Sequence, residues 1–144
     1  MEVSNAKVVV VIDHDVEHAG ELKGFLQQEG YKVKSAESPG IFFENQIDSK
    51  QILAVLVDHQ GDAGETSQML KDLRRQFGKE TLMVFMHEFS VDAFKAAVTA
   101  GFNEYLAKPV GHDELLSLLS RKRRGENPKK ISMTIKIEAT IFDE

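Results

Sequence analysis

The sequence has no cysteine and no hydrophobic run of membrane-spanning length. Without cysteine the chain can form neither a disulfide nor a thiolate metal site. Cysteine usage therefore does not indicate whether the protein works in an oxidising or a reducing compartment. Its apolar runs, such as the one from Val8 to Ile12, are far too short to cross a bilayer. The N-terminus also lacks a basic segment followed by a long apolar one, so we expect a soluble, cytoplasmic protein with no membrane partner.

The charge is unevenly distributed along the chain. The formal net charge is -5, but residues 121–130 alone carry +5, which leaves -10 on the remainder. An acidic body argues against nucleic acid binding over the main surface. Because cations suit a helix C-terminus, we interpret the basic run as a solvated helix end followed by a linker. Nucleic acid would be contacted only through an output domain that this sequence does not contain.

Apolar segments alternate with helical patterns along most of the chain. Strands are expected at 7–12, 31–35, 52–58, 81–86 and 104–107, and helices at about 19–30, 39–46, 64–77, 91–100 and 112–123. This alternation predicts an α/β fold, with a doubly wound, five-stranded parallel sheet covered by helices on both faces. Residues 1–124 are expected to form this domain.

The last part of the chain has a different pattern. From residue 131 to 141, apolar and polar residues alternate strictly, as in an extra C-terminal β-strand with one apolar face. A single strand cannot bury that face alone. We therefore interpret residues 125–144 as a basic linker and a strand tail, which either packs on the body, pairs with a second copy as a dimerising arm or begins a truncated output domain.

Polar residues stand where the predicted strands end. In a doubly wound sheet, ligands bind at the carboxyl ends of the strands. Three of these ends carry Asp13, Asp58 and Lys108. Two neighbouring carboxylates repel each other unless a cation lies between them, and a lysine can supply that charge. These three residues are therefore the first candidates for a functional site.

Four segments around these residues resemble the receiver domain family of response regulators, over about residues 6 to 124. They are Val8 to Asp13, Gly30 to Val33, Val55 to Asp58 and Ala100 to Pro109, and the two aspartates are 45 positions apart. The resemblance implies a flavodoxin-like fold and a signalling receiver, not an enzyme.

The resemblance also assigns roles to single positions. Asp58 would be the phosphoacceptor, served by a histidine kinase or phosphotransfer protein. Asp13, Asp58 and the backbone carbonyl of Gln60 would bind Mg²⁺, while Lys108 would contact the phosphoryl oxygens. The peptide bond between Lys108 and Pro109 would be cis.

The sequence departs from the family at two of these positions. His14 replaces a second acidic residue, and imidazole is a poor ligand for magnesium, so Mg²⁺ binding is expected to be weak or lost. Met86 replaces the Ser or Thr whose hydroxyl bonds the phosphoryl group, and methionine has no donor. Tyr105 stands at the aromatic switch position that normally moves with that hydroxyl.

Three functions remain open at this point. The first is a phosphorylatable receiver that switches a partner or dimer interface, and the second is a phosphorylation-independent pseudo-receiver that acts as an interaction module. A small enzyme or nucleotide binder is weaker, because no glycine-rich loop follows the first strand.

The remaining histidines allow one further interpretation. His14, His59 and His87 follow or end strands at one edge, so a transition-metal cluster is a lesser alternative. His18 and His112 lie near helix starts and are expected to be solvated.

Overall fold

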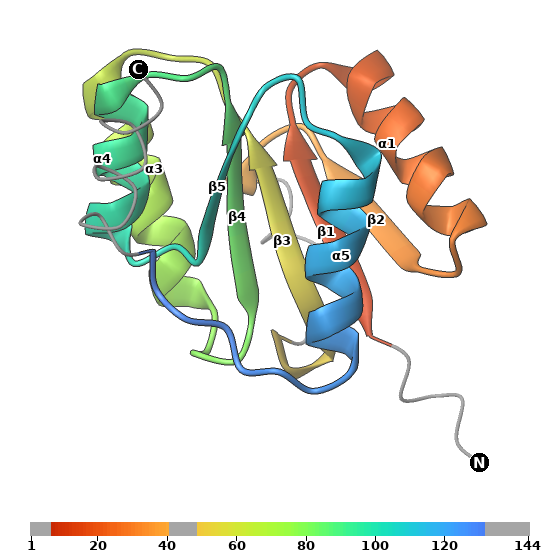
Figure 1. The fold of residues 1–144 in the computed structure, drawn as a ribbon. Coiled ribbons are helices and arrows are strands. Elements are labelled where there is room, and N and C mark those ends of the chain that lie inside the picture. The colour runs from red at the N-terminus through yellow and green to blue at the C-terminus, as the bar shows by residue number, and fades with distance from the viewer. Residues whose placement is uncertain (1–6, 41–48, 132–144) are drawn as a thin grey trace, which may run out of the picture.

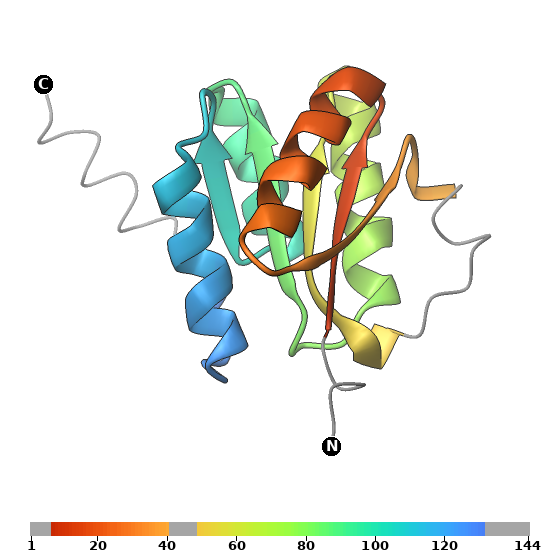
Figure 2. The same ribbon diagram turned by 90° about the vertical axis from the view of Figure 1, so that its right-hand side faces the viewer.

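The computed structural model describes residues 7–40 and 49–131. Its elements, in chain order, are β1 (Val8–Asp13), α1 (Val16–Gln28), β2 (Lys32–Ala36), the short 3-10 helix η2 (Ser49–Gln51), β3 (Ile52–Asp58), α3 (Ala63–Gln76), β4 (Leu82–His87), α4 (Val91–Ala100), β5 (Glu104–Ala107) and α5 (His112–Arg123). Within this part of the chain the strands form one parallel sheet in the order β2-β1-β3-β4-β5. Helices α1 and α5 cover one face, and α3 and α4 cover the other (Figures 1 and 2).

This architecture confirms the predicted doubly wound fold. All five predicted strands are present, each within one residue of its expected bounds. The first helix starts earlier than predicted, at Val16, because Asp15 caps it there. Two of the expected elements lie outside the described residues: most of the helix near 39–46, and the strand at 131–141 beyond its first residue, Ile131. No helix of the described part is both long and apolar enough to cross a membrane.

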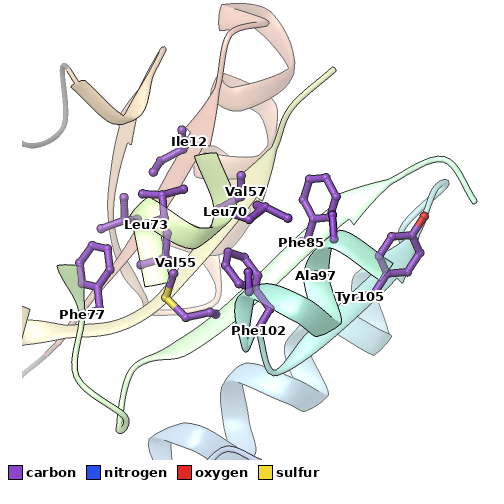
Figure 3. Close-up of a cluster of buried hydrophobic side chains, with 14 of the residues drawn as sticks. Ile12, Val55, Val57, Leu70, Leu73, Phe77, Phe85, Ala97, Phe102 and Tyr105 are labelled. Atoms are coloured by element: carbon purple, nitrogen blue, oxygen red, sulfur yellow. The ribbon is translucent and has the colours of Figure 1, made fainter. Parts of the chain in front are cut away.

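Strands β1 and β3 form the centre of the core. Val9 to Ile12 are at most 2% exposed, and all seven residues of β3 are buried. Because successive side chains point to opposite faces, Val10 and Val55 pack beneath α3 and α4, whereas Val9 and Leu56 pack beneath α1 and α5. Figure 3 shows the cluster beneath α3 and α4. The continuous apolar runs seen in the sequence are thus strands buried on both faces.

Three helices begin with side-chain caps near the carboxyl ends of the strands. Asp15 caps α1, Asp62 caps α3 and Ser90 caps α4, each by accepting a hydrogen bond from the backbone N–H three residues later. Caps of this kind satisfy backbone donors that the helix leaves free. Helix α4 ends at Gly101, whose φ of 85° is a left-handed conformation that glycine adopts readily.

The basic segment at residues 121–130, which includes the last turn of α5, is mostly exposed, as expected, but it is not wholly solvated. The guanidinium of Arg123 lies 3.8 Å from the centre of the Tyr31 ring and donates a hydrogen bond to the carbonyl of Gly30. Further along, the backbone N–H of Ile131 donates to the carbonyl of Phe102. The segment therefore runs back along the sheet domain.

Asn103 joins this segment to the sheet. It is 7% exposed; its Oδ1 accepts a hydrogen bond from Met83 N at 2.7 Å, and its Nδ2 donates to the carbonyl of Lys129 at 3.0 Å. One buried side chain thus satisfies a backbone donor of β4 and anchors the linker.

Replacing Asn103 with alanine is expected to lower the free energy of unfolding by roughly 1–3 kcal/mol, because the buried Met83 N–H loses its acceptor. Urea denaturation monitored by circular dichroism measures this loss. The matched control is Asn127→Ala, an exposed asparagine of the same segment, which should change stability by about 0.5 kcal/mol or less. An equal loss in both variants would contradict the anchoring role.

Candidate functional site

Two aspartates face each other at the ends of β1 and β3. Asp13 and Asp58 are partners in the parallel register, and they are only 2% and 4% exposed. Two carboxylates buried side by side repel each other, so they need cations or hydrogen-bond donors around them. The surroundings of this pair therefore determine what the site can do.

Lys108 supplies a cation to Asp58. Its Nζ lies 2.8 Å from Oδ1 and 2.6 Å from Oδ2 of Asp58, and its side chain is 23% exposed. The backbone N–H of Lys108 donates to the carbonyl of His87, which ties the loop after β5 to the end of β4. The Lys108–Pro109 peptide is cis, as the resemblance implied. The structure thus brings together Asp13, Asp58 and Lys108, as predicted from the strand ends.

His18 also belongs to this site, which the sequence reasoning missed. Its Nδ1 lies 2.6 Å from Oδ2 of Asp13 and 3.5 Å from Oδ2 of Asp58. The side chain is 45% exposed, so the expectation of a solvated histidine was only half right. A signal was available, because Leu22, one helical turn later on the same face of α1, packs against the core.

His14 takes no part in this cluster. It is exposed, and in the described part of the chain the only three potential metal ligands with atoms all within 4.8 Å of one another are Asp13, His18 and Asp58. Gln60 is exposed, two residues beyond β3, and lines a hollow of about 710 Å³ that also reaches Asp58. That the backbone carbonyl of Gln60 binds a metal ion stays a prediction.

The alternative of a metal cluster made of three histidines finds no support in the described residues, because the metal-ligand group just named contains none of the three. His87 Nδ1 lies 2.7 Å from the carbonyl of its neighbour Glu88. Burial lowers the pKa of His59. The charge of Glu65 acts in the opposite direction and raises this pKa, whereas the nearby His14 and His87 lower it further. The three rings lie at the same edge of the sheet, but their nitrogens do not come together closely enough to bind one metal ion.

Met86 lies next to the phosphoacceptor candidate. It pairs with Asp58 in the register of β3 and β4 and is 2% exposed. Its side chain packs into the apolar cluster beneath α1 and α5 and offers no hydrogen-bond donor. The wall of the site is therefore apolar at this position.

Tyr105 is packed inward, on the other face of the sheet. It is 6% exposed, and its ring meets those of Phe85 and Phe94 edge-on. Figure 3 shows Tyr105 at the border of the apolar cluster beneath α3 and α4. Its hydroxyl donates to the carbonyl of Glu88 at 2.8 Å, and burial raises the pKa of Tyr105, so the donor stays protonated. This bond fixes the loop between β4 and α4.

The site opens into a cavity of about 950 Å³. Asp58, Lys108 and His18 line it together with Met86 and the loop residue Phe89. A buried carboxylate and a lysine thus share one space with room for a small anionic group. Such an arrangement suits a carboxylate nucleophile, with an ammonium placed to meet the negative charge on the oxygens of the group that is attacked.

Replacing Lys108 with methionine should lower the free energy of unfolding by roughly 1–3 kcal/mol, because the buried Asp58 loses its charged partner. Chemical denaturation of four proteins tests this: the wild type, Lys108→Met, Asp58→Asn and the double variant. The double variant should lose less than the two single changes together, since no uncompensated charge remains. Strict additivity would contradict the pairing, and Lys95→Met, at an exposed position on α4, serves as the control.

Comparison with known proteins agrees with this geometry. A family model of the response regulator receiver domain matches residues 9–120. A two-component response regulator from Clostridium difficile is 22% identical with a TM-score of 0.67, and the match covers 83% of this chain and 97% of that one. For the chemotaxis protein CheY4 of Vibrio cholerae the identity is 20%, the TM-score 0.65, and the coverage 80% and 97%.

A CheY-like receiver domain protein from Methanospirillum hungatei is similar to the same degree. It is 21% identical with a TM-score of 0.67, and the match covers 83% of this chain and 98% of that one. No curated protein matches the chain. Identities this low indicate a shared fold, whereas the family model spans most of the sequence, including Asp13, Asp58 and Lys108. The chain therefore belongs to the response regulator receiver domain family.

Proposed function

We propose that Asp58 accepts a phosphoryl group from a histidine kinase or a phosphotransfer protein. The chain would then act in the cytoplasm as the receiver of a two-component phosphorelay, and not as an enzyme with its own substrate. The observation that carries this proposal is the buried Asp58 carboxylate, which lines an open cavity with Lys108 Nζ 2.6–2.8 Å from its two oxygens.

The proposed transfer is a simple displacement at phosphorus. A carboxylate oxygen of Asp58 attacks the phosphorus of a phosphohistidine and forms an acyl phosphate. The P–N bond breaks, and the leaving imidazole keeps the bonding pair and takes up a proton. Negative charge is spread over the phosphoryl oxygens, and the ammonium of Lys108 is placed to meet it.

The family implies a magnesium ion, and the residues present partly fit one. Asp13 and Asp58 offer carboxylate oxygens to a common point, as magnesium requires, and the carbonyl of Gln60 is the predicted third oxygen. A bound divalent ion would supply positive charge against the carboxylates and the phosphoryl group. The third side chain that lies close to both carboxylates, however, offers the nitrogen of His18 and not an oxygen.

Phosphorylation would act on the loop after β4. Added charge at Asp58 lies beside Met86, and the adjoining loop is fixed through Tyr105 and Glu88. Phe89 and Val91 in and after this loop are 64% and 56% exposed. We propose that this region, with the neighbouring face of α4, β5 and α5, forms the interface to a partner, an output domain or a second copy.

Incubation with acetyl phosphate and a divalent ion should add one phosphoryl group to the wild type, detected by intact-protein mass spectrometry. Asp58→Asn should abolish the modification. Asp62→Asn, at the exposed cap of α3, should keep it, because asparagine also caps helices. An unmodified wild type with an intact fold would favour the phosphorylation-independent pseudo-receiver instead.

Restoring a hydroxyl next to Asp58 should strengthen the binding of a phosphoryl group. Met86→Thr is expected to bind the phosphoryl mimic beryllofluoride about tenfold more tightly, because a hydrogen bond to a charged group contributes roughly 1.5–3 kcal/mol. Met86→Val is the matched control, since valine has nearly the same shape as threonine but lacks the hydroxyl. Fluorescence or calorimetric titration measures both affinities, and equal values would show that the hydroxyl is not what the site lacks.

A further inference from the structure

The carboxylates of Asp13 and Asp58, together with the imidazole of His18, offer a set of metal ligands that differs from an all-oxygen site. We propose that Asp13, His18 and Asp58 bind a first-row transition-metal ion, such as Co²⁺ or Zn²⁺, in preference to Mg²⁺. This inference rests on the proposed function, because the same Asp58 would accept the phosphoryl group. It concerns which cation serves this chain and which residue selects it.

One of the distances between ligand atoms already suits a shared ion, and a second is shorter than such a site needs. In a tetrahedral site with metal–ligand distances of about 2.0–2.2 Å, the ligand atoms lie roughly 3.3–3.6 Å apart. His18 Nδ1 and Asp58 Oδ2 are 3.5 Å apart. The 2.6 Å contact between His18 Nδ1 and Asp13 Oδ2 would have to widen by about 1 Å or less, and the half-exposed ring has room to turn.

A second observation comes from Asp58 itself. Its Oδ2 is buried and accepts no well-directed hydrogen bond, although Lys108 Nζ lies 2.6 Å away. The hydrogen bond from Lys108 goes to Oδ1 at 2.8 Å. The ammonium of Lys108 therefore lies close to both oxygens, but its hydrogen bond goes to Oδ1, and Oδ2 keeps lone pairs that can bind a metal ion.

His18 is held on a rigid element. Its backbone N–H donates to Oδ1 of Asp15, the cap of α1, and the backbone N–H of Asp15 in turn donates to Oδ1 of Asp13. The cap thus fixes the helix start relative to the first carboxylate. The backbone that carries the His18 ring is therefore held beside the carboxylates, while the ring itself can turn toward an ion.

The chemistry of the donors decides the preference. Magnesium favours six oxygens, whereas imidazole nitrogen suits Zn²⁺, Co²⁺ and their neighbours. With three protein ligands and an adjoining cavity of about 950 Å³, the ion would keep an open position for water or a phosphoryl oxygen. His14 is exposed and contributes nothing to this set of donors.

The test is a titration with the metal chlorides alone, without any phosphoryl donor. Isothermal calorimetry gives the affinities for Mg²⁺, Mn²⁺, Co²⁺ and Zn²⁺, and the visible absorption of bound Co²⁺ reports a nitrogen ligand. The wild type should bind Co²⁺ and Zn²⁺ more tightly than Mn²⁺, and Mg²⁺ most weakly. His18→Gln offers an oxygen in place of the nitrogen.

His18→Gln should lose at least about tenfold in Co²⁺ and Zn²⁺ affinity, since loss of even an outer-sphere partner typically costs 10–100-fold. Its Mg²⁺ affinity should not fall. His14→Gln should behave like the wild type, and Asp13→Asn should weaken every ion. Unchanged Co²⁺ affinity and spectrum in His18→Gln, or a wild type that prefers Mg²⁺, would overturn the inference.

The phosphorylation assay separates this inference from the proposed function. If the wild type prefers Mg²⁺ and Asp58 is still modified, the metal preference is wrong and the receiver function stands. If the wild type binds Co²⁺ through His18 but Asp58 is modified with neither ion, the metal site stands and the proposed phosphoacceptor role is wrong.

Discussion

The repulsion between the carboxylates of Asp13 and Asp58 is the constraint on which the rest of this edge depends. The parallel register of β1 and β3 places the two residues opposite each other, and both are nearly inaccessible to solvent. Such a pair persists only if cations or donors compensate it. Lys108 does so on one side, from the loop after β5, and His18 approaches from the first turn of α1 on the other.

The elements that carry these two groups are fixed by their own local chemistry. The cap at Asp15 sets the start of α1, and the hydrogen bond from Lys108 N to the carbonyl of His87 ties the loop after β5 to β4. Tyr105 then fixes the neighbouring loop through the carbonyl of Glu88. Hydrogen bonds to backbone groups thus hold three elements around the site in place.

The family relation and the departures from it concern different parts of the molecule. The fold is shared with solved receivers at identities of 20–22%, because a buried parallel sheet requires only that apolar residues continue along each strand. The site requires particular atoms at particular places. Met86 therefore fits the apolar core, while its thioether gives the wall of the site no hydrogen-bond donor.

Much of the site could be predicted from the strand ends, because parallel strands end at a common edge. That rule, with the resemblance, was enough to select Asp13, Asp58 and Lys108. His18 could not be selected in the same way. It lies within a helix, and a helical residue reaches a neighbouring strand end only through the angle at which the helix packs on the sheet.

The sequence by itself determined the order of strands and helices, because strands buried on two faces leave continuous apolar runs and the helices between them leave apolar residues at helical spacing. It also determined which strand ends carry charge. The tertiary structure decided which of the five histidines meets the carboxylates and how Asn103 anchors the linker to β4. The contacts of Asn103 and the approach of His18 to Asp58 join elements distant along the chain. Even the contact of His18 with Asp13, five residues earlier, depends on how the helix packs on the sheet, which no local pattern encodes.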